Sequence, residues 1–162
     1  MRIDLRVGTR ALAGELTYVR SDASFLFLPA QRAELEERAA GGVWAAQIGT
    51  LQVAVSVLRN EALYADGLHA TALWADRVCG VPNAPEGAAF LRPPTAIGSG
   101  IGVSIAGVAQ WRTVFDASTG WVRVGEDEDP DDMAVMIASG VVLGSKDGHL
   151  HSLWLRPRFV PQ

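Results

Sequence analysis

The sequence of 162 residues carries 14 basic and 18 acidic side chains, for a net charge of −4 at neutral pH, and 49% of its residues are hydrophobic. This length and composition predict one globular domain over residues 1–162. The sequence contains neither a run of eighteen apolar residues nor the hydrophobic segment of a signal peptide, so we expect a cytoplasmic protein without a membrane partner. The single cysteine, Cys79, excludes an internal disulfide and a multi-cysteine metal site.

Short segments with alternating polarity predict β-strands in most of the chain. The segments at 2–8 and 15–22 are expected to form a hairpin, and a further strand at 24–29 ends at Pro29. Residues 29–42 begin with proline, contain helix formers and end in two glycines, so one short helix is predicted near residues 30–40. Later strands are expected at 43–48, 51–58, 68–75, 87–93, 102–115, 120–125, 133–144 and 149–159.

Turn signals separate these later strands. They are Arg59-Asn60, Asp66-Gly67, residues 98–100, residues 118–120 and Asp147-Gly148. Many short strands at nearly regular spacing predict an all-β fold, and we interpret it as a small antiparallel β-barrel of about 8–10 strands.

Acidic residues are concentrated in one segment, at positions 126–132, where six of seven side chains are acidic. Like charges repel and Pro130 interrupts regular structure, so a solvated surface loop is the simplest interpretation. A calcium loop would need alternating ligands and a glycine turn, which this segment lacks. The chain also has no basic patch interleaved with aromatic residues, so nucleic acid is not an expected partner.

One predicted strand, residues 102–115, has an unusual apolar face. Alternation along this strand places on one side Val103, Ile105, Gly107, Ala109, Trp111 and Phe115. Glycine and alanine leave space around the indole, so this face suits the wall of a pocket. The ordinary alternative, a tryptophan that fills a core, stays open.

Common catalytic motifs are absent from the sequence. It contains no GxSxG, HExxH, P-loop, CxxC or dinucleotide-binding pattern, so no cofactor and no metal are expected. His149 and His151 would share a strand face, but a metal site would need a third ligand from elsewhere, and solvated side chains are the simpler interpretation. His69, with Asp66 and Asp76 nearby in sequence, is a candidate base oriented by a carboxylate.

Several segments resemble a known family in order and spacing. They are "AAQIGT" at 45–50, "ADGLHATALWAD" at 65–76, the glycine-rich "AIGSGIGVSIAG" at 96–107 and "AGVAQWR" at 106–112. Together, over about residues 43–113, they resemble the spirotetronate cyclases, which are small barrels of the allene oxide cyclase-like type. Only Trp111 matches a family residue, the pocket tryptophan. The part of the chain from Ser118 onward has no counterpart in the family.

The resemblance implies a cofactor-independent cyclase of bacterial natural-product biosynthesis. Such an enzyme closes a ring in a linear, hydrophobic polyketide-like substrate by an intramolecular [4+2] cycloaddition inside the barrel. A pericyclic reaction needs no nucleophile, so catalysis would come from orienting the substrate and from a polar group on its carbonyl. The expected catalytic residues are Trp111, Tyr64, His69 and Gln110, and the expected substrate-binding residues are Trp111, Trp74, Val103, Ile105, Ala109 and Phe115.

Two other functions remain open at this stage. A non-catalytic partner-binding protein, such as an immunity protein that neutralises a basic toxin, would use the acidic segment. A carrier barrel would bind a small ligand without turnover. A homodimer is a further possibility, because a second copy could cover the apolar strand at 133–144.

Overall fold

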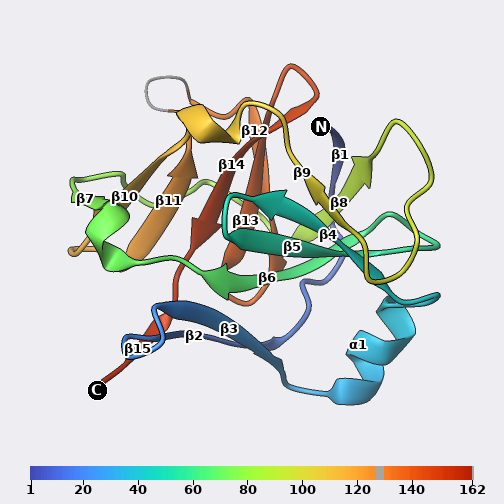
Figure 1. Cartoon of the computed structure of the whole chain (residues 1–162), viewed down its shortest axis with the longest axis horizontal. Helices are drawn as coiled ribbons and strands as arrows, with labels where there is room; N and C mark the ends of the chain where they lie inside the picture. The colour runs from blue at the N-terminus through green and yellow to red at the C-terminus, as the bar shows by residue number, and fades with distance from the viewer. Residues whose placement is uncertain (127–129, 162) are drawn as a thin grey trace.

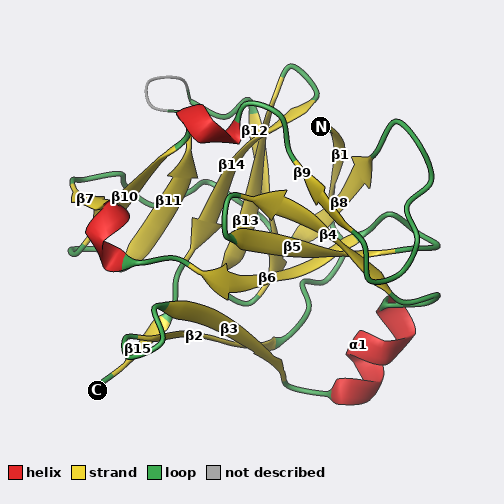
Figure 2. Ribbon diagram, viewed as in Figure 1, coloured by secondary structure: helices red, strands yellow, loops and turns green. Residues whose placement is uncertain are grey.

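The computed structural model describes residues 1–126 and 130–161, and its strands form two sheets (Figures 1 and 2). The first sheet runs β12 (Met133–Ala138), β13 (Val141–Lys146), β14 (His149–Leu155), β11 (Trp121–Gly125), β10 (Arg112–Asp116) and β7 (Trp74–Asp76), with β1 (Arg2–Val7) joining β14 to β8 (Gly87–Arg92). The second runs β15 (Arg158–Val160), β2 (Gly14–Val19), β3 (Ser24–Pro29), β6 (Ala62–Leu68), β5 (Leu51–Ser56), β4 (Val43–Ile48) and β9 (Gly102–Ser104). The fold is therefore mostly β, as predicted.

The expected closed antiparallel barrel is wrong. Within the described residues, each sheet keeps open edges, and the two sheets meet through isolated bridges such as Glu61 with Phe90. Three strand pairs are parallel: β4 with β9, β7 with β10, and β2 with β15. Each parallel pair joins segments far apart in the chain, which local alternation cannot predict.

One α-helix lies where the sequence predicts it. α1 (Arg32–Arg38) follows β3 and ends before the positive-φ glycines Gly41 and Gly42. Its ion pairs, exposed Arg32 with Glu36 and partly buried Arg38 with Glu34, are spaced four residues apart. No helix in the described parts of the chain is long and apolar enough to cross a membrane.

Side chains from both sheets fill the space between them. The largest fully buried side chains include Trp44, Tyr18, Phe25 and Leu12, each at most 1% exposed. The core cluster continues through β12 and β13, where Val135 and Leu143 are fully buried. The apolar residues of the predicted strand at 133–144 are thus mostly buried by the chain itself, and the expected homodimer stays a prediction.

Two turn predictions are wrong. β1 pairs with β8 and β14, whereas β2 pairs with β3, so residues 2–22 do not form a hairpin. Asp66 and Gly67 lie inside β6 rather than in a turn. Gly67 has a φ of +121°, and a Cβ there would collide with the Thr50 carbonyl, so close strand approach explains this glycine.

The predicted strand at 102–115 is broken in the middle. β9 ends at Ser104, and the 3₁₀ turn η2 (Val108–Gln110) precedes β10. Gly107 enters this turn with a φ of +83°, and the Trp111 amide donates a hydrogen bond to the Val108 carbonyl. The period of two is lost here, so the six residues assigned to one face do not share a surface.

Candidate functional site

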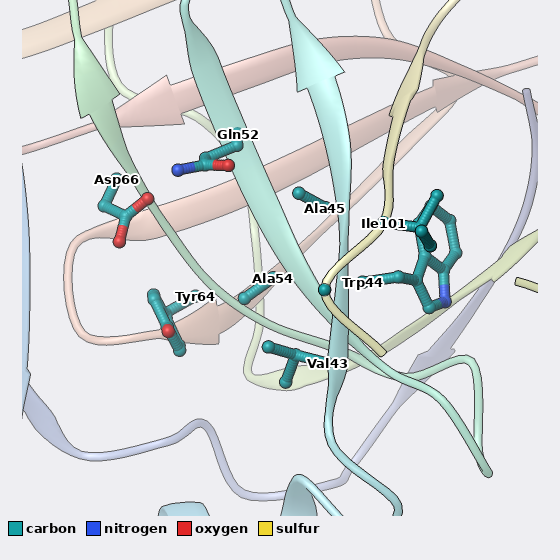
Figure 3. Close-up of a pocket in the computed structure, with 9 residues that line it drawn as sticks. Val43, Trp44, Ala45, Gln52, Ala54, Tyr64, Asp66 and Ile101 are labelled. Atoms are coloured by element: carbon teal, nitrogen blue, oxygen red, sulfur yellow. The ribbon is translucent and has the colours of Figure 1, made fainter. Parts of the chain in front are cut away.

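A pocket of about 210 Å³ lies on the face of β4, β5 and β6 that points away from the core (Figure 3). We call it the Tyr64 pocket. It is lined by Val43, Trp44, Ala45, Gln52, Ala54, Tyr64, Asp66, Gly100 and Ile101. It opens to solvent.

Strand register brings these residues together. Ala54 is paired with Ala45 on β4 and with Tyr64 on β6, and Gln52 is paired with Asp66. The alternating neighbours, including Val53 and Ala65, point into the core and are fully buried. Two alanines therefore form a low floor, and larger side chains rise at its edge. The parallel pairing of β9 with β4 adds the wall that contains Ile101.

Tyr64 is held by a stacked aromatic neighbour. Its ring lies 5.5 Å from the Phe27 ring, centroid to centroid, with an angle of 13° between the planes. Burial raises the pKa of Tyr64, and the nearby charge of Asp66 raises it further. The Tyr64 hydroxyl therefore keeps its proton at neutral pH and can donate a hydrogen bond.

Asp66 supplies a second polar group in the same pocket. Burial raises the pKa of Asp66, while a hydrogen bond with Gln52 lowers it. In Figure 3 its carboxyl group lies at the same end of the pocket as Gln52, beyond the alanine floor. A partly buried carboxyl group with a perturbed pKa in a pocket is a typical functional-site feature. The pocket thus offers three polar side chains, the Tyr64 hydroxyl, the Asp66 carboxyl and the Gln52 amide.

Three other predicted site residues gather elsewhere. The Trp74 ring lies 5.7 Å from Phe115 and 6.3 Å from His69, measured between centroids. Trp74 and Phe115 line a second pocket of about 200 Å³, together with Arg20, Thr71, Asp76 and Phe159. The structure therefore brings these three residues together, but not with Tyr64 or Trp111.

His69 is not oriented by a carboxylate. Its Nε2 lies 2.7 Å from the Thr113 hydroxyl, and burial lowers the pKa of the ring. Its Nδ1 and the Trp74 Nε1 are buried without a hydrogen-bond partner among the described residues. The histidine thus belongs to the aromatic cluster between the two sheets, with Thr113 in place of the expected Asp66 or Asp76.

The remaining predicted residues are dispersed. Trp111 is half-buried, packs against the core and lines neither of these pockets. Ala109 and Gln110 are exposed in η2. Val103 and Ile105 line a third pocket, next to β1. The broken strand explains this separation, because the turn at Gly107 redirects the chain.

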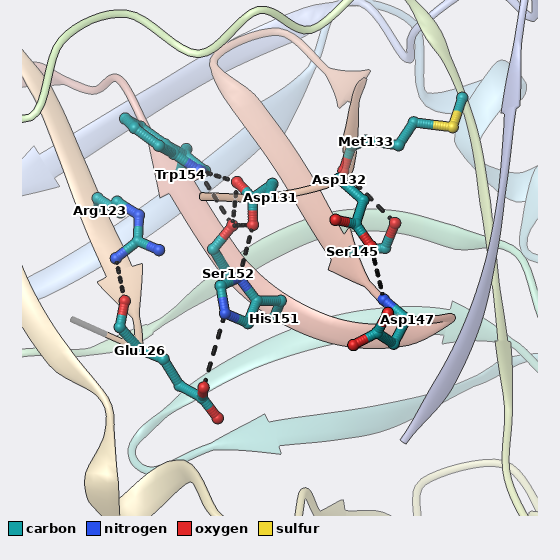
Figure 4. Close-up of polar contacts among 10 residues, drawn as sticks. All are labelled: Arg123, Glu126, Asp131, Asp132, Met133, Ser145, Asp147, His151, Ser152 and Trp154. Carbon is teal, nitrogen blue, oxygen red and sulfur yellow. Dashed lines mark hydrogen bonds and ion pairs between the residues drawn. The ribbon is translucent and has the colours of Figure 1, made fainter. Parts of the chain in front are cut away.

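A buried polar network that the sequence did not predict joins the acidic segment to β14 (Figure 4). We call it the Asp131 network. Asp131 accepts hydrogen bonds from the Ser152 hydroxyl at 2.7 Å, from His151 Nδ1 at 2.9 Å and from Trp154 Nε1 at 3.2 Å. His151 Nε2 lies 3.6 Å from a Glu126 carboxylate oxygen.

Backbone irregularity makes room for this network. The pairing of β13 with β14 shifts between Gly144 and Ser145, which leaves His151 without a partner residue on β13. His151 is consequently 5% exposed, whereas His149 is exposed, so the expectation of two solvated histidines is wrong for His151. A Cβ at Gly144 would overlap both Asp131 and Ser152.

The Asp131 network fits a structural role. Both carboxylate oxygens already accept hydrogen bonds, and no group of three or more metal-ligating side chains comes together in the described residues. The Arg123 guanidinium also donates to the Glu126 carbonyl at 2.7 Å. The acidic segment is therefore attached at Glu126 and at Asp131, while residues 127–129, part of the predicted loop, lie outside the described residues.

No protein-family model matches the sequence, and the search of curated proteins finds no significant relative.

Proposed function

We propose that the Tyr64 pocket binds a small planar molecule that carries a hydrogen-bond acceptor and donor on one edge, as a lactam or an enolised dicarbonyl does. The observation that carries this proposal is that Tyr64 and Asp66 line one pocket together with a floor made by Ala45 and Ala54. The flat face of the ligand would lie on the alanines, where no larger side chain rises.

The size of the pocket limits this ligand. Pockets that bury drug-sized molecules usually have volumes of about 300–1,000 Å³, and the Tyr64 pocket has about 210 Å³. It therefore accommodates a group of one or two fused rings, and a longer substrate would extend over the surface. This argues against complete enclosure of a linear polyketide.

Ring closure is the activity that we propose for this pocket, in keeping with the cyclase resemblance. The Tyr64 hydroxyl would donate to a carbonyl conjugated with the dienophile, and this donor would stabilise charge that develops on the oxygen. Orientation of the two reacting ends would supply the rest of the acceleration. Because the pocket is open, this second contribution would be smaller than in an enclosed site.

Binding is tested with 2-quinolone, a planar lactam, and with N-methyl-2-quinolone, which has lost the donor. We expect calorimetry to show tighter binding of 2-quinolone. Tyr64→Phe should weaken it about fivefold to tenfold, since a hydrogen bond contributes about 1 kcal/mol. Tyr18→Phe is the matched control, because that hydroxyl bonds the His69 carbonyl in the core. Equal binding of the two quinolones, or equal affinity in wild type and Tyr64→Phe, would refute the proposed donor and acceptor.

Catalysis is tested separately from binding. A linear acyl substrate that contains a conjugated diene and an enone should cyclise faster with the protein than in buffer, and Ala54→Phe should abolish the difference by filling the floor. Wild-type protein that binds 2-quinolone but gives no acceleration would be a ligand carrier at this pocket, and the cyclase proposal would be rejected.

A further inference from the structure

Three basic side chains lie next to one another across neighbouring strands of the first sheet. Arg2 of β1 is directly paired with Arg92 of β8 and, on its other side, with His149 of β14. All three residues are exposed. We call them the basic row. Like charges on directly opposed residues destabilise a sheet, so this arrangement is locally unfavourable in the absence of an anion.

Neighbouring carboxylates compensate only part of this charge. Asp4 lies 3.4 Å from the Arg92 guanidinium, and Arg6 shares the same carboxylate oxygen at 3.3 Å. Arg2 forms no ion pair within residues 1–126 and 130–161. His149 Nδ1 lies 3.0 Å from the Asp147 carbonyl oxygen. A cationic surface thus persists in a chain of net charge −4.

The basic row borders a pocket of about 400 Å³. Its other side is apolar and includes Val103 of β9, the buried Ile105 and Pro94. The pocket therefore takes residues from both sheets, since β1 and β8 belong to the first sheet and β9 to the second. This volume falls in the usual range of about 300–1,000 Å³ for ligand sites.

We propose that this pocket binds an amphipathic organic anion, a carboxylate or phosphate monoester joined to an apolar chain. Arg2 and Arg92 bind the anionic group through their guanidinium hydrogen-bond donors, which match carboxylate and phosphate geometry. Val103 and Ile105 contact the apolar chain. The bound anion also removes the repulsion between the paired arginines. This site is separate from the Tyr64 pocket and does not depend on its function.

The proposal is tested by titrating the protein with octanoate, octyl phosphate, octan-1-ol and acetate. We expect the two amphipathic anions to bind at least about tenfold more tightly than octan-1-ol, which lacks the charge, and than acetate, which lacks the chain. Added salt should weaken binding of the anions and leave octan-1-ol unaffected. Preference for octanoate over octyl phosphate, or the reverse, identifies the headgroup, and either result supports the site.

Variants assign the binding to the basic row. The double change Arg2→Gln and Arg92→Gln should reduce octanoate affinity about tenfold or more, since two charge-assisted contacts are lost. Arg6→Gln is the matched control, because Arg6 is an exposed arginine of the same strand that shares Asp4 but does not line the pocket. Thermal unfolding checks that each variant is folded.

Three results would overturn the proposal. They are octanoate binding no tighter than octan-1-ol, an unchanged affinity in the double variant, and an equal loss in Arg6→Gln. Binding to phosphatidylglycerol vesicles without binding to monomeric octyl phosphate would also overturn it, because the basic row would then recognise a lipid surface and not a molecule within the pocket.

Discussion

Replacing Asp131 by alanine would leave three buried donors without their common acceptor. Trp154 Nε1 keeps an alternative, because it also lies 3.1 Å from the Ser152 hydroxyl oxygen. The Ser152 hydroxyl and His151 Nδ1 lose the acceptor, and both residues are at most 5% exposed. An unsatisfied buried group costs about 1–3 kcal/mol, and water can reach part of the vacated space. We therefore expect Asp131→Ala to lower the free energy of unfolding by about 3 kcal/mol.

Urea denaturation measures this loss directly. The m-value of the urea transition should be unaltered. In a separate thermal unfolding experiment, a chain of this size should show a fall in Tm of about 6–12 °C for such a change. Asp132→Ala is the control because it removes the adjacent carboxylate, which is exposed and accepts one hydrogen bond, from the Asp147 amide at 2.8 Å. The free energy of unfolding of that variant should fall by less than about 1 kcal/mol. Equal losses in the two variants would show that the Asp131 network does not stabilise the fold.

Three further changes test other parts of the structure. Trp111→Ala should lower the free energy of unfolding, measured by urea denaturation, by about 1–3 kcal/mol, since the indole is half-buried. It should leave 2-quinolone binding unchanged, and a loss of that binding would show that Trp111 belongs to the ligand site. Gly144→Ala should destabilise the protein as much as Asp131→Ala, because its methyl group would displace the Asp131 carboxyl; a shift in Tm below about 2 °C would contradict this. Hydrogen bonds from the Ser118 hydroxyl and from backbone amides lower the pKa of Asp116 to about 2. The ionised Asp116 carboxylate therefore stabilises the folded protein fully above about pH 4, and this stabilisation disappears as the pH falls through 2. The stability difference between wild type and Asp116→Asn should therefore shrink over that interval, and a constant difference would contradict the assignment.

Local patterns in the sequence predicted the secondary structure better than the arrangement of the strands. Alternation located β4 and β5, and the proline and glycine boundaries located α1. The same patterns gave a continuous strand at 102–115, because valine, isoleucine and tryptophan favour strands. Gly107 was the signal for the break, since its left-handed conformation starts η2, but a glycine in a strand pattern also fits a bulge.

The candidate site was only partly predictable from the sequence. Tyr64 was identified as a polar candidate, but its partners Gln52 and Ala54 come from a neighbouring strand whose register cannot be derived from alternation alone. The Asp131 network depends on a register shift in β14 and on the missing side chain of Gly144. Contacts of this kind arise from pairings between distant segments, and these pairings also decide whether a sheet closes.

The parallel pairing of β2 with β15 has a consequence for synthesis on the ribosome. Thr17 is paired with Arg158, which is translated 141 positions later. At elongation rates of about 5–20 residues per second, the open edge of β2 waits about 7–28 s for its partner strand. During that interval the nascent chain exposes backbone groups that can pair with other chains, so a chaperone that shields β2 should raise the yield of native protein.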